Sequence, residues 1–173
     1  MQKSNWGKGL LCGLIGGLAG TIVMTEFQNA WSKASQAVHS GNSGEQPSQQ
    51  GSPQEKEDAT MKAAGKIASV AGKELSHGQK KTLGPVVHYS FGALQGSLYG
   101  LILELARQEG GMLPAVIFGA ALFAIADEVA VPALGLSGKP TEYPLGTHVY
   151  ALAAHLVYGL STEISRRGLR ASL

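Results

Sequence analysis

Four long apolar stretches dominate the chain, and each contains or adjoins an ionisable residue. They cover residues 9–27, 83–104, 112–131 and 144–164. A helix that crosses a bilayer needs roughly 17–25 predominantly apolar residues, so all four stretches are long enough. The helices of a soluble bundle would show a polar face of ordinary width, which the first two stretches lack. The sequence therefore predicts an all-α fold, a four-helix transmembrane bundle in a single membrane domain spanning residues 1–173.

The polar residues are concentrated in one insert between the first and second stretches. Residues 32–57 are rich in Ser, Gln, Gly and Pro and predict a mobile loop. Residues 58–75 predict an amphipathic helix that Asp58 caps, with Met61, Ala64 and Ile67 on its apolar face. A short amphipathic helix ahead of a span is expected to lie on the membrane surface.

The flanks of the four stretches predict the orientation of the chain in the membrane. The first stretch lacks a clear cleavage site, so we expect an uncleaved span rather than a signal peptide. Four spans place both termini on one side, and short cytoplasmic flanks carry an excess of Lys and Arg. The other side has only Lys139 in its short loop. The termini are therefore predicted to be cytoplasmic, since the flanking basic residues on their side are Lys3, Lys8, Arg107, Arg166, Arg167 and Arg170.

Glycines recur at four-residue spacing in the first two stretches. Small residues at this spacing let the backbones of neighbouring membrane helices approach closely. Tight packing of the first two helices is the simplest expectation, and a ridge left open could also hold a second copy of the chain as a homo-oligomer. The glycines concerned are Gly9, Gly13, Gly16, Gly17 and Gly20, then Gly84, Gly92, Gly96 and Gly100.

Several runs resemble a known family. They are the run 84–92 followed by Gly96, Tyr99 and Gly100, the run 132–137, the run 155–159 with Glu163 and Arg166, and, more loosely, 16–26. Together they resemble the YagU-like family of uncharacterised small bacterial inner-membrane proteins. The resemblance implies a multi-pass protein of the bacterial inner membrane with a tie to acid tolerance and no established chemistry.

Alternating the four helices across the membrane sorts the ionisable residues into two levels. One level holds Glu26, His88, Asp127, Glu128 and His148, with His155 about 10 Å deeper on the face of His148. The opposite level holds Glu104, Arg107, Glu163, Arg166 and Arg167, which are predicted to face the lipid headgroups.

Three interpretations of the first level remain open. The side chains could be polar contacts that fix helix packing. They could form a protonatable path, because His titrates between pH 5 and 8. They could also bind Zn, Mn or Fe, although no short ligand motif is present.

Other function classes have little support in the sequence. The net charge of +2 and the lack of a basic patch argue against nucleic-acid binding. No hydrolase, P-loop or zinc-protease motif occurs, so neither an enzyme nor a cofactor is expected. A small channel or transporter-like protein that responds to protons is the first hypothesis, with the lipid bilayer as its surroundings. The alternatives are a structural or accessory membrane subunit without transport, and a metal-binding membrane protein.

Overall fold

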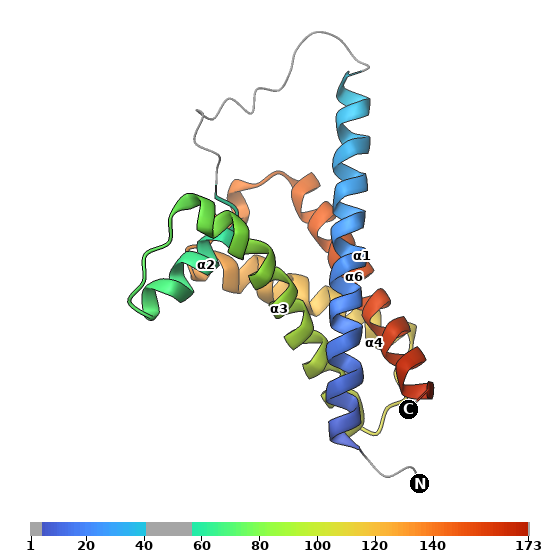
Figure 1. The fold of residues 1–173 in the computed structure, drawn as a ribbon. Helices are drawn as coiled ribbons and strands as arrows, with labels where there is room; N and C mark the ends of the chain where they lie inside the picture. The colour runs from blue at the N-terminus through green and yellow to red at the C-terminus, as the bar shows by residue number, and fades with distance from the viewer. Residues whose placement is uncertain (1–4, 41–56, 173) are drawn as a thin grey trace.

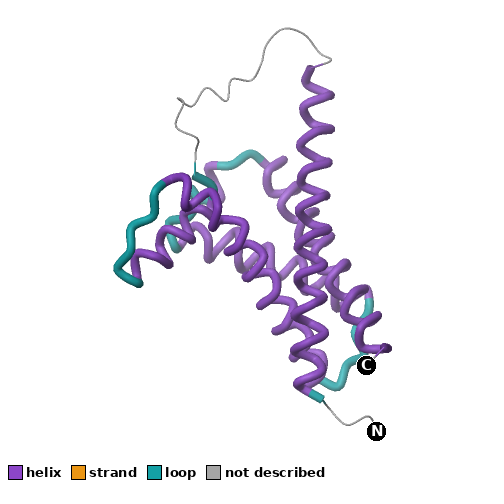
Figure 2. The backbone as a smooth tube through the Cα atoms, in the orientation of Figure 1, coloured by secondary structure: helices purple, strands orange, loops and turns teal. Residues whose placement is uncertain are grey.

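The computed structural model describes residues 5–40 and 57–172, and this part of the chain is helical and contains no strand (Figure 2). The all-α fold class is thereby confirmed. In chain order the elements are α1 (Trp6–Ser40), α2 (Ala59–Val70), α3 (His77–Leu105), α4 (Met112–Leu122), the π-helix η1 (Phe123–Ala130), α5 (Val131–Ala133), the 3-10 helix η2 (Pro140–Glu142) and α6 (Leu145–Ser172).

Helix α1 is longer than the sequence predicts. It continues past residue 27 and through Ser40, so the prediction of a mobile loop from residue 32 is wrong for 32–40, and 41–56 lie outside the described residues. The physical reason is that no Gly or Pro occurs between Thr21 and Ser40 to break the helix. At a rise of 1.5 Å per residue, a helix of this length spans about 50 Å, well beyond a hydrocarbon core of about 30 Å.

The insert forms a short capped helix and the first turns of α3. The carboxylate of Asp58 accepts a hydrogen bond from the Met61 amide at 2.8 Å, so the predicted N-cap is confirmed. The helix ends at Val70 rather than at residue 75, because Gly72 adopts a left-handed conformation with φ of 71°. A capping box of Ser76 and Gln79 then starts α3 at His77, six residues before the predicted start at 83.

Helix α2 packs against α3 (Figure 1). Its buried Met61 packs with Thr60 against Gly84, and Lys66 donates a hydrogen bond to the Leu134 carbonyl at the end of α5. The helix therefore bridges two elements of the protein.

Glycines bring three helix pairs into backbone contact. A Cβ on Gly13 would overlap the Gly96 carbonyl, and a Cβ on Gly100 would overlap the Gly9 carbonyl, so α1 and α3 pack antiparallel along the predicted ridge. The opposite face of α1 uses Gly16 and Gly20 against α6. Helices α4 and α6 meet in the same way, with Gly119 against the His155 carbonyl and Gly159 against the Ala115 carbonyl.

These antiparallel contacts place four helix ends together. The start of α1, the end of α3, the start of α4 and the end of α6 lie at one end of the molecule (Figure 1). The opposite end holds α2, η1, η2 and the start of α6. The far half of α1 extends beyond the other helices there.

Large apolar side chains are widely exposed, whereas several charged ones are buried. Leu94, Met112 and Leu113 are 65%, 73% and 70% exposed, whereas Glu163 and Arg166 are 3% and 1% exposed. Two helices, Trp6–Ala37 and Met112–Ala133, are long and apolar enough to cross a membrane by length and composition. The other two predicted spans, in α3 and α6, fall short because these helices carry more polar residues.

Candidate functional site

The candidate site is built on a π-helical stretch, η1, within the apolar helix that runs from Met112 to Ala133. Hydrogen bonds from residue i to i+5 widen the helix there, and such stretches are frequent at functional sites. Pro132 has no amide hydrogen and cannot donate to Glu128, four residues earlier, which favours a departure from regular α-helix. Neighbouring residues Asp127 and Glu128 both reach histidines of α6 from this stretch.

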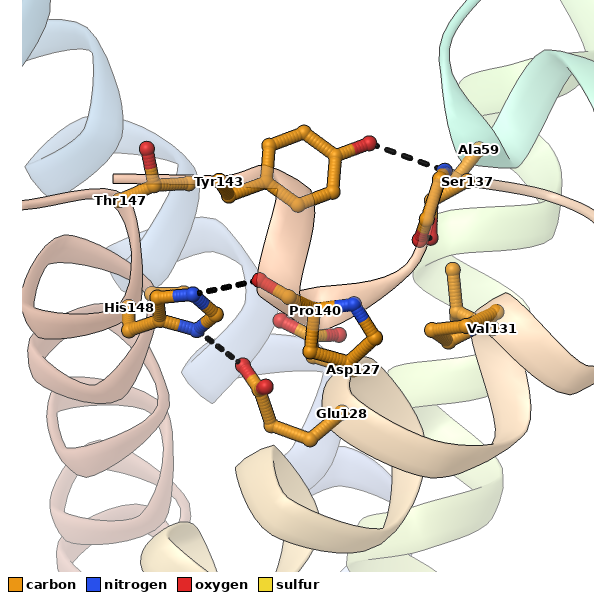
Figure 3. A pocket seen from close by; sticks show the side chains of 12 residues that line it. Ala59, Asp127, Glu128, Val131, Ser137, Pro140, Tyr143, Thr147 and His148 are labelled. Atoms are coloured by element: carbon orange, nitrogen blue, oxygen red, sulfur yellow. Dashed lines mark hydrogen bonds and ion pairs between the residues drawn. The ribbon is translucent and has the colours of Figure 1, made fainter. Parts of the chain in front are cut away.

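Glu128 pairs with His148 at the first turn of α6. The distance between Glu128 Oε1 and His148 Nδ1 is 2.7 Å, and His148 Nε2 lies 3.1 Å from the Pro140 carbonyl (Figure 3). A carbonyl only accepts, so we assign the proton on Nε2 to this bond. The Nδ1 contact then needs a second proton, shared with the carboxylate, because a bare ring nitrogen would face a bare carboxylate. The pair therefore holds one proton more than neutral imidazole and ionised carboxylate hold together.

Asp127 lies next to the deeper histidine. Its Oδ2 is 3.7 Å from Nδ1 of His155, which donates to the Ala151 carbonyl at 2.9 Å. His155 is 8% exposed, and its ring lies 6.0 Å from that of Phe123. His88 of α3 is half-buried, and its ring lies 5.8 Å from that of Tyr89. Among the described residues, no hydrogen bond or ion pair joins His88 to Asp127 or His155, so Asp127 pairs with the deeper histidine only.

A cavity of about 210 Å³ opens beside these residues (Figure 3). Asp127, Glu128 and His148 line one part of it, and Tyr143, which accepts a hydrogen bond from the Gly138 amide at 3.0 Å, lines another. The rest of the lining comes from small apolar and hydroxyl side chains, namely Ala59, Val131, Pro132, Ser137, Pro140, Thr147 and Ala151.

The six residues predicted from the sequence do not all meet. Glu128 pairs with His148 and Asp127 pairs with His155, from neighbouring positions of η1, whereas no hydrogen bond or ion pair within the described residues joins His88 to this group. Glu26 is exposed on α1, and no hydrogen bond or ion pair among the described residues joins it to these pairs, so the structure does not bring it into the group. His155 does not stand alone beneath the others, because Asp127 reaches down to it.

A second polar group lies at the opposite end of the molecule, and the prediction made for it from the sequence is wrong. Glu163 and Arg166 were predicted to face lipid headgroups, but both are buried, and Arg166 binds both carboxylate oxygens at 2.7 and 3.0 Å. Arg170 pairs with buried Glu104 at 2.7 Å. The i, i+3 spacing of Glu163 and Arg166 was the one signal in the sequence that could have indicated this pairing.

These contacts tie the chain segments at that end together. Glu163 accepts from the Gly111 amide at 2.6 Å, Arg166 donates to the Glu109 carbonyl at 2.9 Å, and Glu104 accepts from the Asn5 amide at 3.2 Å. The connection between α3 and α4 is therefore held against α6 by side-chain hydrogen bonds. A Cβ on Gly110, at φ of 87°, would overlap the Glu163 carboxylate and the Arg166 guanidinium, so only glycine fits there.

Within residues 5–40 and 57–172, no group of three or more His, Cys, Asp or Glu side chains is arranged to hold a metal ion. The metal-binding interpretation of the cluster thus gains no structural support. No family model, curated protein or solved structure matches the chain in the comparisons with known proteins.

Proposed function

We propose that the chain is a multi-pass protein of the bacterial inner membrane, in which α1, α3, the helix from Met112 to Ala133, and α6 cross the bilayer. The distribution of polarity supports this proposal, because large apolar side chains face outward while His155, Glu163 and Arg166 are buried. Glycine contacts between helix backbones are also typical of membrane helices.

The membrane proposal has a direct test. The protein should stay in the membrane fraction after alkaline extraction, and a reporter fused to the C-terminus should be accessible only from the cytoplasm. Release into the alkaline supernatant would refute the bilayer location, and labelling of the reporter from outside intact cells would refute the orientation.

Within this frame we propose a small channel or transporter-like protein that responds to protons. The observation that carries the proposal is the pairing of Asp127 and Glu128 with His155 and His148 beside a cavity, on a π-helical stretch of an apolar helix. The Glu128–His148 contact needs a shared proton, so its loss at higher pH would put a bare ring nitrogen against a carboxylate. The resemblance to the YagU-like family adds a tie to acid tolerance.

Proteoliposomes that carry a pH-sensitive dye test this function. The parent protein is expected to dissipate an imposed pH gradient faster than empty vesicles, and Glu128→Gln should slow this at least tenfold. Glu26→Gln is the matched control, because Glu26 is an exposed carboxylate outside the cluster. A parent protein that dissipates the gradient no faster than empty vesicles would reject proton transport.

A structural or accessory subunit without transport is the second candidate. It is favoured by the partners that Glu128, His148 and His155 already find within the protein, which is how polar side chains stabilise helix contacts in lipid. In this case Glu128→Gln should lower the thermal unfolding midpoint in detergent, while neither parent nor variant moves protons.

A further inference from the structure

The cavity beside η1 carries one carboxylate, that of Asp127, with which no Lys or Arg of the described residues pairs. Glu128 shares a proton with His148 at 2.7 Å, which neutralises that pair. Asp127 differs, because the nitrogen that it faces, His155 Nδ1, is 3.7 Å away and donates its hydrogen to the Ala151 carbonyl. Among the described residues, no Lys or Arg forms an ion pair with Asp127, whose side chain is 38% exposed.

Other charged groups nearby do not change this balance. Asp58 at the start of α2 adds negative charge, although its carboxylate accepts from Met61 and Thr60. Lys66 is held by the Leu134 carbonyl, and neither it nor Lys139 lines the cavity. The local charge therefore favours a cation over an anion.

The walls indicate what sort of cation fits. Val131, Pro132, Pro140 and Ala151 supply apolar surface, and the Tyr143 ring can lie against a cationic head. The volume of about 210 Å³ corresponds to roughly seven water molecules, which is smaller than the ~300–1000 Å³ of sites for drug-sized molecules. A compact ligand with a short hydrocarbon body and one positive head satisfies both the walls and the carboxylate.

We propose that this cavity binds a small organic cation, of the class of short alkylammonium ions, with the Asp127 carboxylate as its counter-ion. The proposal names the substrate class of the transporter-like function proposed above and rests on it. Bare metal ions fit less well, because the described residues offer no group of three ligands. Asp127 would hold the ammonium head, and the hydrocarbon body would lie against Val131 and Ala151.

Titration calorimetry of the purified full chain with n-butylammonium chloride tests the proposal. We expect saturable binding to the parent, and binding at least tenfold weaker for Asp127→Asn, which keeps the shape and removes the charge. The neutral molecule 1-butanol should also bind at least tenfold more weakly than the ammonium ion. Glu26→Gln should bind n-butylammonium as the parent does, because Glu26 lies outside the cluster.

A second variant keeps the carboxylate and fills the cavity. Ala151→Leu should abolish saturable binding while the circular dichroism spectrum stays helical, so the test does not depend on the folding of Asp127→Asn alone. Absence of saturable binding to the parent would overturn the proposal. Binding to Asp127→Asn as tight as to the parent, or equal binding of 1-butanol, would do so as well.

The proton measurement separates this proposal from the function on which it rests. Proton movement in proteoliposomes without any binding of n-butylammonium would leave the proposed function standing and overturn the assignment of the ligand class. Binding of n-butylammonium that depends on Asp127, without proton movement, would support the cation site and reject the proton response.

Discussion

Arg166 should be the most sensitive charged position in the chain. Its side chain is 1% exposed and donates to Glu163 at 2.7 and 3.0 Å and to the Glu109 carbonyl at 2.9 Å. Arg166→Met removes all three bonds and leaves the 4%-exposed Glu163 side chain with the Gly111 amide as a partner. Leaving one member of a buried ion pair unpaired costs about 3–5 kcal/mol. For a chain of this size, each kcal/mol lowers the unfolding midpoint by about 2–4 °C, so we expect a drop of roughly 6–20 °C.

The assay is thermal unfolding in detergent, followed by tryptophan fluorescence. Arg167→Met, at the exposed neighbouring position, is the matched control and should cost less than about 1 kcal/mol. The double variant Glu163→Gln/Arg166→Met should recover more than half of the loss, because it removes the unpaired charge and keeps an acceptor for the Gly111 amide. Equal midpoints for Arg166→Met and Arg167→Met would refute the reasoning. So would a double variant whose loss of stability equals the sum of the losses in Glu163→Gln and Arg166→Met.

Three further predictions follow from other contacts. Gly96→Ala would press a methyl group into the Gly13 carbonyl and the Gly17 backbone and should cost about 1–3 kcal/mol in thermal unfolding, whereas Gly146→Ala, with open space around it, should not destabilise. Tyr158→Phe should cost about 1 kcal/mol in the same assay, because its buried hydroxyl donates to the Gly92 carbonyl at 2.6 Å; an unchanged midpoint would show that this bond adds nothing. The hydrogen bond from Lys80 lowers the pKa of Glu57 below its ordinary 4.5, so the stabilisation is present above that value and is lost as the pH falls through the lowered pKa. The protection of the α2 amides from exchange, relative to an unfolded chain at the same pH, should therefore fall in that acidic range in the parent, and Glu57→Gln should not show this acid-dependent step.

The glycine ridge illustrates what the sequence could predict. The spacing of Gly9, Gly13 and Gly17 identifies a surface without side chains, and such a surface can only be useful where another backbone approaches. The contact with Gly96 and Gly100 confirms this expectation. Spacing is a local property of each helix, and for that reason it survives in the folded protein.

Glu26 illustrates what depth alone could not predict. Alternating helices predict its height in the bundle but not its direction around the helix axis. At 100° per residue, Glu26 lies about 180° around α1 from Gly17, which faces α3. A residue on that side points away from α3 whatever its height, and Glu26 is accordingly exposed. The direction of a side chain around the helix axis depends on which face of the helix packs, and the sequence indicates that face only at the glycines.

The prediction for the polar residues at the other end of the molecule was wrong for a different reason. Counting Arg166 and Arg170 as headgroup residues assumes that a basic residue near a helix end reaches the interface. Arg166 instead pairs with Glu163, three residues earlier in the same helix, and Arg170 pairs with Glu104, which the packing of α6 and α3 on α1 brings close. The pairing of Arg170 with Glu104 joins residues from different helices, so no pattern within one helix predicts it.

The cluster depends on the irregularity of η1 in a way that periodicity could not reveal. His148 and His155 are seven residues apart, about 10 Å along α6, whereas Asp127 and Glu128 are adjacent and differ by about 1.5 Å in height. In a regular helix, adjacent side chains diverge by about 100°, so two neighbours would not both face one partner helix. The wider turn of η1 lets both face α6, where Glu128 reaches toward the start of the helix and Asp127 toward His155. Glu128 shares a proton with His148 at 2.7 Å, whereas the nitrogen of His155 is 3.7 Å from Asp127. The π-helical stretch therefore leaves beside the cavity a carboxylate without a close hydrogen-bonded partner, which is the arrangement that the proposed cation site uses.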